Sequence, residues 1–169
     1  MKRNLLLLSL LLSFSLFGQN QIAKQVATLQ DLKTNFKKVS VLTPNTSIIS
    51  SDVEKVVDGA TLAKVDLSKI NQVFNSKDNY IELEIPYQNQ SISVLLYKIN
   101  PFTEDFQIDT DKQKNVAYQI GVYYRGIIKN DVNSVSSFNF FNGEFNGIIS
   151  SEIFGNLVIG KLNKKDNQL

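Results

Sequence analysis

Carboxylate side chains are the main candidates for chemistry in this sequence, because its 169 residues include no histidine and no cysteine. These absences exclude imidazole proton transfer, thiolate attack and zinc sites built from histidine and cysteine. Glu82 and Glu84 lie two residues apart on a predicted strand, so they share a face and form a candidate carboxylate pair for acid–base catalysis. The alternating Ile81, Leu83 and Ile85 predict the buried side of that strand, which leaves both glutamates on a solvated face.

The other polar residues show no arrangement typical of a functional site. Asp105, Asp109 and Asp111 resemble scattered calcium ligands, but the glycine and the terminal glutamate of a calcium loop are missing, so we expect an acidic loop. The serines at 134, 136, 137, 150 and 151 lack a histidine partner, and no glycines have phosphate-binding spacing. We therefore predict a chain that is not an enzyme, with no catalytic, cofactor-binding or metal-binding residues and no cofactor.

The charge balance argues against a nucleic-acid partner. The chain has 18 lysines and arginines against 16 aspartates and glutamates, a formal charge of +2. Loss of Lys2 and Arg3 with an N-terminal leader leaves 16 basic and 16 acidic residues, with Arg125 the remaining arginine. A neutral chain with so little arginine is poorly suited to binding phosphate backbones.

The N-terminus has the pattern of a secretory signal peptide. Lys2 and Arg3 precede an apolar run of 13 residues, Leu5 to Phe17, which Gln19 ends. A membrane-spanning helix needs about 20 apolar residues, which argues against the alternative of an uncleaved anchor. We predict that residues 1–18 are a signal peptide cleaved after Gly18 and that the protein is secreted or periplasmic, without a stable membrane span.

Residues 19–60 are predicted to form an N-terminal helix and a linker. Spacings of three and four residues predict an amphipathic helix from about Gln21 to Lys38, packed against a sheet, with the stripe Ile22, Val26, Leu29, Leu32, Phe36 and Val39. Pro44 to Ser47 mark a loop. A short strand after Thr61 and a brief helix capped by Ser68 follow, and the predicted buried side of that helix consists of Leu67, Ile70, Val73 and Phe74.

Residues 61–162 are predicted to be mainly β-structure. A hairpin joins Tyr80–Ile85 to Ser91–Ile99 through a loop of about five residues, Pro86 to Gln90. A meander follows, with strands at 118–128, 135–141, 145–154 and 157–162, a tight turn at Asn142-Gly143 with two positive φ angles, and a second turn at Gly155-Asn156. Residues 163–169 form a polar tail. The predicted fold is α+β, a meander or sandwich-like antiparallel sheet with an N-terminal amphipathic helix and a short second helix.

Within this β-rich part, residues 122–149 carry a longer pattern. Tyr124 and Gly126 lie on one predicted strand, Ser134 opens the next after a polar turn, and Gly143 and Gly147 lie on the hairpin return. This arrangement resembles the propeptide of reprolysin (adamalysin) zinc metalloproteases, which has a Tyr-x-Gly strand, a serine and a Gly-Leu-x-Gly return. Glu144 is one residue more than the Gly-Leu-x-Gly pattern has between its two glycines. The resemblance extends over about residues 62–162 and is to bacterial secreted members of the family.

The resemblance implies a non-catalytic prodomain that assists folding of a reprolysin-like protease and keeps it latent. Its implied partner is the metalloprotease catalytic domain, in cis or in trans, since the His-Glu-x-x-His zinc helix is absent from this chain. Val122 and Phe141 occupy positions that hold cysteines in animal members, and no free cysteine is present to bind the catalytic zinc. The alternative function is a free-standing secreted binding or adhesion module of β-sandwich type.

Overall fold

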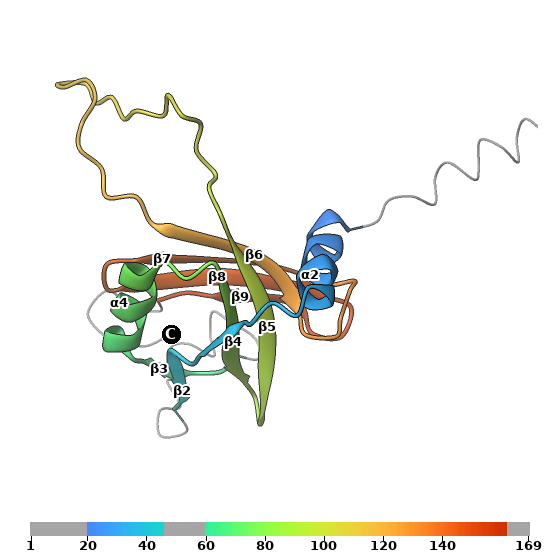
Figure 1. Cartoon of the computed structure of the whole chain (residues 1–169). Helices are drawn as coiled ribbons and strands as arrows, with labels where there is room; N and C mark the ends of the chain where they lie inside the picture. The colour runs from blue at the N-terminus through green and yellow to red at the C-terminus, as the bar shows by residue number, and fades with distance from the viewer. Residues whose placement is uncertain (1–19, 46–59, 162–169) are drawn as a thin grey trace, which may run out of the picture.

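The computed structural model describes residues 20–45 and 60–161. The predicted signal peptide, most of the predicted linker and the polar tail lie outside these ranges. Figure 1 shows a large sheet with two helices on opposite sides of it. The elements are α2 (Gln21–Asp31), β1 (Lys37–Val39), β2 (Leu42–Pro44), β3 (Ala63–Val65), α4 (Leu67–Ser76), β4 (Tyr80–Tyr87), β5 (Gln90–Ile99), β6 (Val122–Ile128), β7 (Val135–Phe141), β8 (Glu144–Ser151) and β9 (Gly155–Ile159).

Seven strands form one open sheet in the order β1-β4-β5-β6-β7-β8-β9. All neighbours are antiparallel except β1, which pairs in parallel with β4. The remaining strands, β2 and β3, form a separate two-stranded antiparallel layer. The predicted α+β fold dominated by antiparallel sheet is therefore confirmed, with one open sheet and one small second layer.

The main core lies on the face of the sheet that α4, β2 and β3 cover, which we call the α4 face. Alternate residues of each strand point to this face, and their largest fully buried side chains are Tyr124, Phe138 and Phe140. Burying side chains of this size contributes about 1.5–3 kcal/mol each, so this cluster is the principal source of stability. The opposite face, the α2 face, has a smaller core where Ala23 and Val26 of α2 meet Leu95 and Ile127.

Helix α2 ends seven residues earlier than the predicted limit of Lys38. Lys33 adopts a left-handed φ of 54°, its N–H donates to Gln30 O at 2.9 Å, and the N–H of Thr34 donates to Leu29 O at 3.0 Å. These are the two hydrogen bonds of a Schellman C-cap, which satisfies the last carbonyls and turns the chain away. Leu32 is consequently 72% exposed instead of belonging to the buried stripe.

Helix α4 is capped two residues earlier than predicted. The side chain of Asp66, not Ser68, accepts a hydrogen bond from the backbone N–H of Lys69 at 3.1 Å. Three of the four residues predicted for the buried side, Ile70, Val73 and Phe74, are buried, but Leu67 is 37% exposed because it is the first residue of the helix. Aspartate is as good an N-cap as serine, so the local signal was present two positions before the predicted cap.

Two of the predicted turns are wrong in detail. Strands β4 and β5 continue to Tyr87 and Gln90, which pair with each other, so the hairpin loop has two residues rather than five. Pro86 fits inside β4 because β1 pairs only with Ile81–Leu83, which leaves the missing N–H of Pro86 on an unpaired edge. At the end of the meander, Gly155 begins β9 and pairs with Ser151, so the turn lies before Gly155 instead of at Gly155-Asn156.

The turn at Asn142-Gly143 lies where the sequence predicts it, between Phe141 of β7 and Glu144 of β8. Only Gly143 has a positive φ, of 78°, so the expected pair of positive angles is not found. The backbone N–H of Gly143 also donates to the Asn71 side chain of α4 at 2.8 Å, which ties the turn to the helix. A contact from outside the hairpin therefore helps to select this turn geometry.

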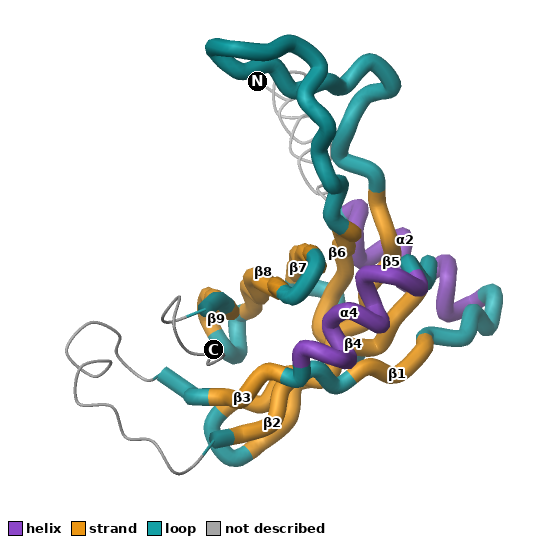
Figure 2. The backbone as a smooth tube through the Cα atoms, turned by 90° about the vertical axis from the view of Figure 1, so that its left-hand side faces the viewer, coloured by secondary structure: helices purple, strands orange, loops and turns teal. Residues whose placement is uncertain are grey.

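Residues 100–121, between β5 and β6, project from the sheet as a long loop, which we call the arm (Figures 1 and 2). The predicted strand at 118–128 therefore begins only at Val122. At the base of the arm, the ring of Phe102 packs against that of Phe106 with centroids 4.2 Å apart and planes tilted by 38°, and it makes an edge contact with Tyr123 at 5.4 Å. Tyr123 in turn contacts Phe141 of β7 at 6.0 Å. These ring contacts fix the root of the arm on the α2 face.

Candidate functional site

The candidate carboxylate pair lies on β4, and the two members have different surroundings. Glu82 and Glu84 share the α2 face, as predicted, but Glu82 is only 7% exposed, so the expected solvated face is wrong for this residue. Glu82 Oε1 accepts hydrogen bonds from Lys129 Nζ and Ser93 Oγ, both at 2.7 Å. Glu84 Oε2 accepts one from Ser91 Oγ at 2.6 Å. Each glutamate is thus held by its own serine on β5.

The environment of Glu82 favours its ionised form. Burial raises the pKa of this carboxyl, but the hydrogen bonds from Lys129 and Ser93 outweigh burial, and the pKa lies below its ordinary value. A general acid at neutral pH needs a raised pKa, so Glu82 is poorly suited to that role. The arrangement is that of a structural ion pair that joins β4 and β5 to the turn after β6.

Stability should fall at acidic pH because of Glu82. Folding lowers the pKa of the Glu82 carboxyl below its value in the unfolded chain, which is near 4.5. The stabilisation by the ionised carboxylate is therefore present above pH 4.5 and is lost as the pH falls through the lower pKa of the folded state. We expect Glu82→Gln to cost about 1–2 kcal/mol at pH 7. Thermal unfolding from pH 7 to pH 3 should show a smaller loss in this variant than in the wild type.

The matched control for this prediction is Lys129→Met, which removes the half-exposed partner of Glu82 and leaves the carboxyl in place. Its pH dependence should also be weaker than that of the wild type, because burial then acts on the Glu82 pKa with less opposition. Equal pH dependence in all three proteins would show that this ion pair does not contribute.

Gly126 and Gly147, two residues of the family resemblance, lie on the α4 face of β6 and β8, where no side chain fits. A Cβ on Gly126 falls 1.8 Å from the backbone oxygen of Leu95 on β5. A Cβ on Gly147 falls 2.1 Å from the Cδ1 atom of the Phe138 ring. Gly126 therefore permits close approach of two strands, and Gly147 leaves room for a core phenylalanine.

Tyr124 and Ser134, also part of the resemblance, make buried hydrogen bonds to the backbone. The Tyr124 hydroxyl donates to the Asp78 carbonyl oxygen at 2.8 Å, and burial raises the pKa of this phenol far above its ordinary value, so it stays protonated. Ser134 Oγ accepts from the Ile128 N–H at 2.8 Å and donates to Asp131 O at 2.7 Å. The first contact joins β6 to the start of β4, and the second closes the turn between β6 and β7.

The remaining candidates do not converge on a reactive centre. Asp109 Oδ1 accepts from the Asn115 N–H at 2.8 Å inside the arm, while Asp105 and Asp111 are exposed. Within residues 20–45 and 60–161, no group of three or more acidic residues is placed to hold a metal ion. Ser136 is fully buried on β7 and its Oγ has no hydrogen-bond partner there, but no base accompanies it.

An exposed apolar patch lies on the part of the α2 face that helix α2 leaves uncovered. It consists of Val135 of β7, Ile148 of β8 and Val158 of β9, which are 39%, 44% and 79% exposed. Ile148 pairs directly with Val158, and Val135 lies diagonally across from Ile148. We call these residues the β7–β9 patch. The patch adjoins the edge of the sheet, since β9 is the last strand of the order.

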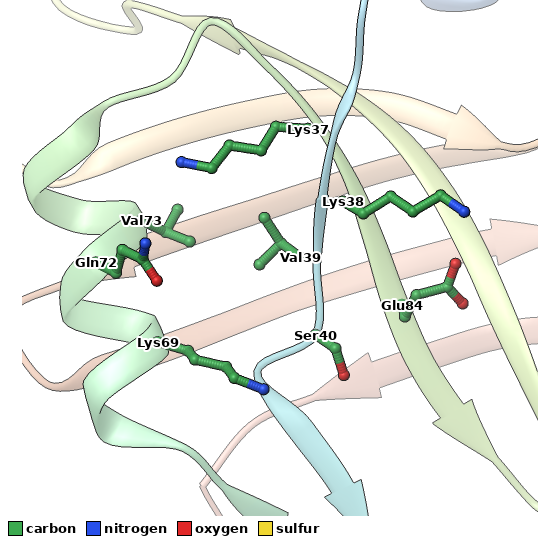
Figure 3. A pocket seen from close by; sticks show the side chains of 8 residues that line it. All are labelled: Lys37, Lys38, Val39, Ser40, Lys69, Gln72, Val73 and Glu84. Carbon is green, nitrogen blue, oxygen red and sulfur yellow. The ribbon is translucent and has the colours of Figure 1, made fainter.

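A groove of about 450 Å³ lies between helix α4 and edge strand β1 (Figure 3). Its lining comes from Lys37, Lys38, Val39 and Ser40 at β1, from Lys69, Gln72 and Val73 of α4, and from Glu84 of β4. The sequence does not predict this groove, because the predicted first helix extends over Lys37 and Lys38. Two signals for extended chain were present: Val39 and Val41 alternate around Ser40, and the weak helix formers Thr34 and Asn35 precede them.

No protein-family model, curated protein or solved structure shows a significant match to the chain. Among the helices of the described residues, none is long and apolar enough to cross a membrane. The function must therefore be argued from the residues and their placement.

Proposed function

We propose that this chain is a secreted, non-catalytic prodomain-like module that assists folding of a reprolysin-like zinc metalloprotease and keeps it latent. The observation that carries the proposal is the arrangement of the five resembling residues. Tyr124 and Gly126 lie on β6, Ser134 ends the turn into β7, and Gly143 and Gly147 lie on the β7–β8 hairpin. The strand, polar turn, serine and hairpin return of the propeptide pattern thus correspond to three consecutive strands of one sheet.

A non-catalytic role is supported by the chemistry of the described residues. The most buried carboxylate, Glu82, is paired with Lys129, and the serines lack a base. Such a chain acts by covering a partner surface rather than by making or breaking bonds.

The β7–β9 patch is the surface we assign to contact with the protease. Among the described residues β9 is the last strand of the sheet, and exposed apolar side chains beside such an edge combine burial with backbone hydrogen bonding, which is how a sheet docks an extended partner segment. Val158, at 79% exposure, is the patch residue with the most area to bury.

Inhibition by this module should be steric and independent of thiol chemistry. A cysteine switch places a thiolate on the catalytic zinc, and this chain contains no cysteine. The purified chain should bind a cognate reprolysin-like catalytic domain and slow its cleavage of a peptide substrate. The inhibition constant should be the same with and without a mercurial reagent, and a change on adding the mercurial would contradict the steric mechanism.

A pair of matched variants tests the assigned surface. Val158→Asp should weaken inhibition by about tenfold, because it places a charge in the apolar contact. Val132→Asp changes the same residue type at a position that is 60% exposed in the turn after β6, outside the patch, and should leave inhibition unchanged. If the chain binds none of the reprolysin-like catalytic domains tested, the adhesion-module alternative replaces the prodomain.

A further inference from the structure

We propose that the groove between α4 and β1 binds an extended acidic peptide segment, which adds to the sheet as a strand beside β1. This site is separate from the β7–β9 patch, at the opposite end of the strand order. It does not depend on the prodomain role, because any partner with such a segment satisfies it. Three features of the groove support this ligand: the groove follows the edge of β1, its walls carry lysines, and its floor is apolar.

The lining residues show that the groove follows the edge of β1. Lys37, Lys38, Val39 and Ser40 are consecutive and all line it. Side chains of a strand alternate between the two faces, so four successive residues line one groove only when it runs along the strand edge. Within the described part of the chain, β1 pairs with β4 on one side, and the other side is the end of the sheet. An added strand therefore finds backbone donors and acceptors there.

The opposite wall is helix α4. Lys69, Gln72 and Val73 are spaced by three and four residues, so they lie on one face of the helix, which faces the groove. A space bounded by a strand edge and a parallel helix wall suits a single extended chain. Because β1 has three residues, such a chain has about three or four residues in register with it, or about 10 Å at 3.3 Å per residue.

The charge of the walls selects an acidic ligand. Lys37 and Lys69 extend into the space between α4 and β1, while Lys38 and Glu84 lie on the other side of β1 (Figure 3). Lys37 has a counter-ion, Asp78, at 2.8 Å, but the contact of Lys69 with Asp66 is long, at 3.8 Å, and about half of each lysine side chain is exposed. Glu84 is engaged by Ser91. Carboxylates on the α4 side of a bound strand would meet two ammonium groups and no acid that lines this side.

The floor of the groove is apolar. Val39 and Val73 are buried members of the main core and also line the groove. A bound strand that carries acidic residues therefore gains from aliphatic residues as well, which bury against these valines. Because Lys37 and Val39 lie on the same face of β1, the ligand chemistry we infer is a short extended segment with a glutamate and a valine two residues apart, so that both side chains point to the α4 side, rather than a free anion or a polyacidic run.

The test uses a fluorescein-labelled eight-residue peptide, Gly-Ser-Glu-Ser-Val-Ser-Glu-Gly, in which the glutamates and the valine share one face of an extended strand, and the purified full chain, with binding followed by fluorescence anisotropy. We expect saturable binding to the wild type. A peptide with lysine in place of each glutamate should bind at least about tenfold more weakly. A peptide N-methylated at the glutamates and the valine cannot donate backbone hydrogen bonds from these positions and should show a similar loss, which a purely electrostatic contact would not produce.

Variants of the chain then place the peptide. Lys69→Glu should weaken binding about tenfold, and it should fold, because an acidic residue in the first turn of a helix is favourable. Lys112→Glu makes the same change on the exposed arm and should leave binding unaltered. In amide spectra of the labelled chain, the peptide should shift the signals of Lys37 to Ser40.

Three results would overturn the proposal. They are equal binding of the glutamate and lysine peptides, equal binding of the N-methylated peptide, and shifts that omit β1. A fourth is a dimer in sedimentation that Lys69→Glu dissociates, because the groove would then hold a second copy of this chain. The protease inhibition assay is independent of all four results, so this proposal and the prodomain proposal fail separately.

Discussion

Replacing Gly126 with alanine should prevent stable folding or cost at least about 3 kcal/mol, at the upper end of what overpacking costs. The added Cβ falls 1.8 Å from Leu95 O, 2.8 Å from Leu95 C and 3.0 Å from Leu96 Cα. All three atoms are backbone, so no side chain can rotate away, and the central β5–β6 pair must separate. Urea unfolding followed by circular dichroism measures the change.

Gly143→Val is the matched control, because it adds a larger side chain to a glycine with nothing within 4 Å of its Cβ position. Its cost should come only from the positive φ of 78° and should be about 1–3 kcal/mol. We expect Gly126→Ala to lower the free energy of unfolding more than Gly143→Val does. A Gly126→Ala protein as stable as the wild type would mean that β5 and β6 do not approach as closely as the structure shows.

Phe138→Ala should destabilise the protein by about 3–5 kcal/mol, the usual cost of removing a buried phenylalanine. Phe138 is fully buried and stacks on Phe145, with ring centroids 5.6 Å apart and planes at 4°. Its ring also occupies the space over Gly147 of β8. Deleting the ring therefore opens a cavity next to a residue that has no side chain.

The contact between Phe138 and Gly147 can be tested by measuring whether Gly147→Ala raises or lowers the stability in two backgrounds. In the wild type, Gly147→Ala should cost about 1–3 kcal/mol, because the new methyl group displaces the Phe138 ring. In the Phe138→Ala protein the same substitution meets no ring and should be neutral or stabilising by up to about 1 kcal/mol. Additive effects in this double-mutant cycle would show that the ring does not lie over Gly147.

The strands of the meander are predictable from sequence because their signals are local. Val135–Phe141 is rich in aromatic residues, and the Asn142-Gly143 turn determines where the chain reverses. The short strand Ala63–Val65 and the helix after it were found in the same way. The predicted α+β fold class follows from these periodicities, since a period of two and a period of 3.6 residues require different partners.

The predictions fail where one element continues into another without a strong break. The apolar spacing from Ile22 to Val39 fits a helix throughout, yet the Schellman cap at Lys33 ends α2 and releases Lys37–Val39 to pair with β4. Pairing of β1 with a strand more than 40 residues away in the sequence is a non-local contact, so no window of sequence contains its signal.

The two helices and the strands from β3 to β9 were therefore determined largely by the sequence itself, as was the lack of histidine and cysteine that removes most catalytic chemistry. Tertiary structure alone decided three things: that Glu82 is buried beside Lys129, that Val135, Ile148 and Val158 stay exposed together, and that lysines of β1 and α4 face one groove. Alternation assigns a side chain to a face of the sheet, but what covers that face depends on where helices and distant strands pack. Where they pack depends on the total apolar surface that the whole chain buries, and no local sequence pattern contains this information.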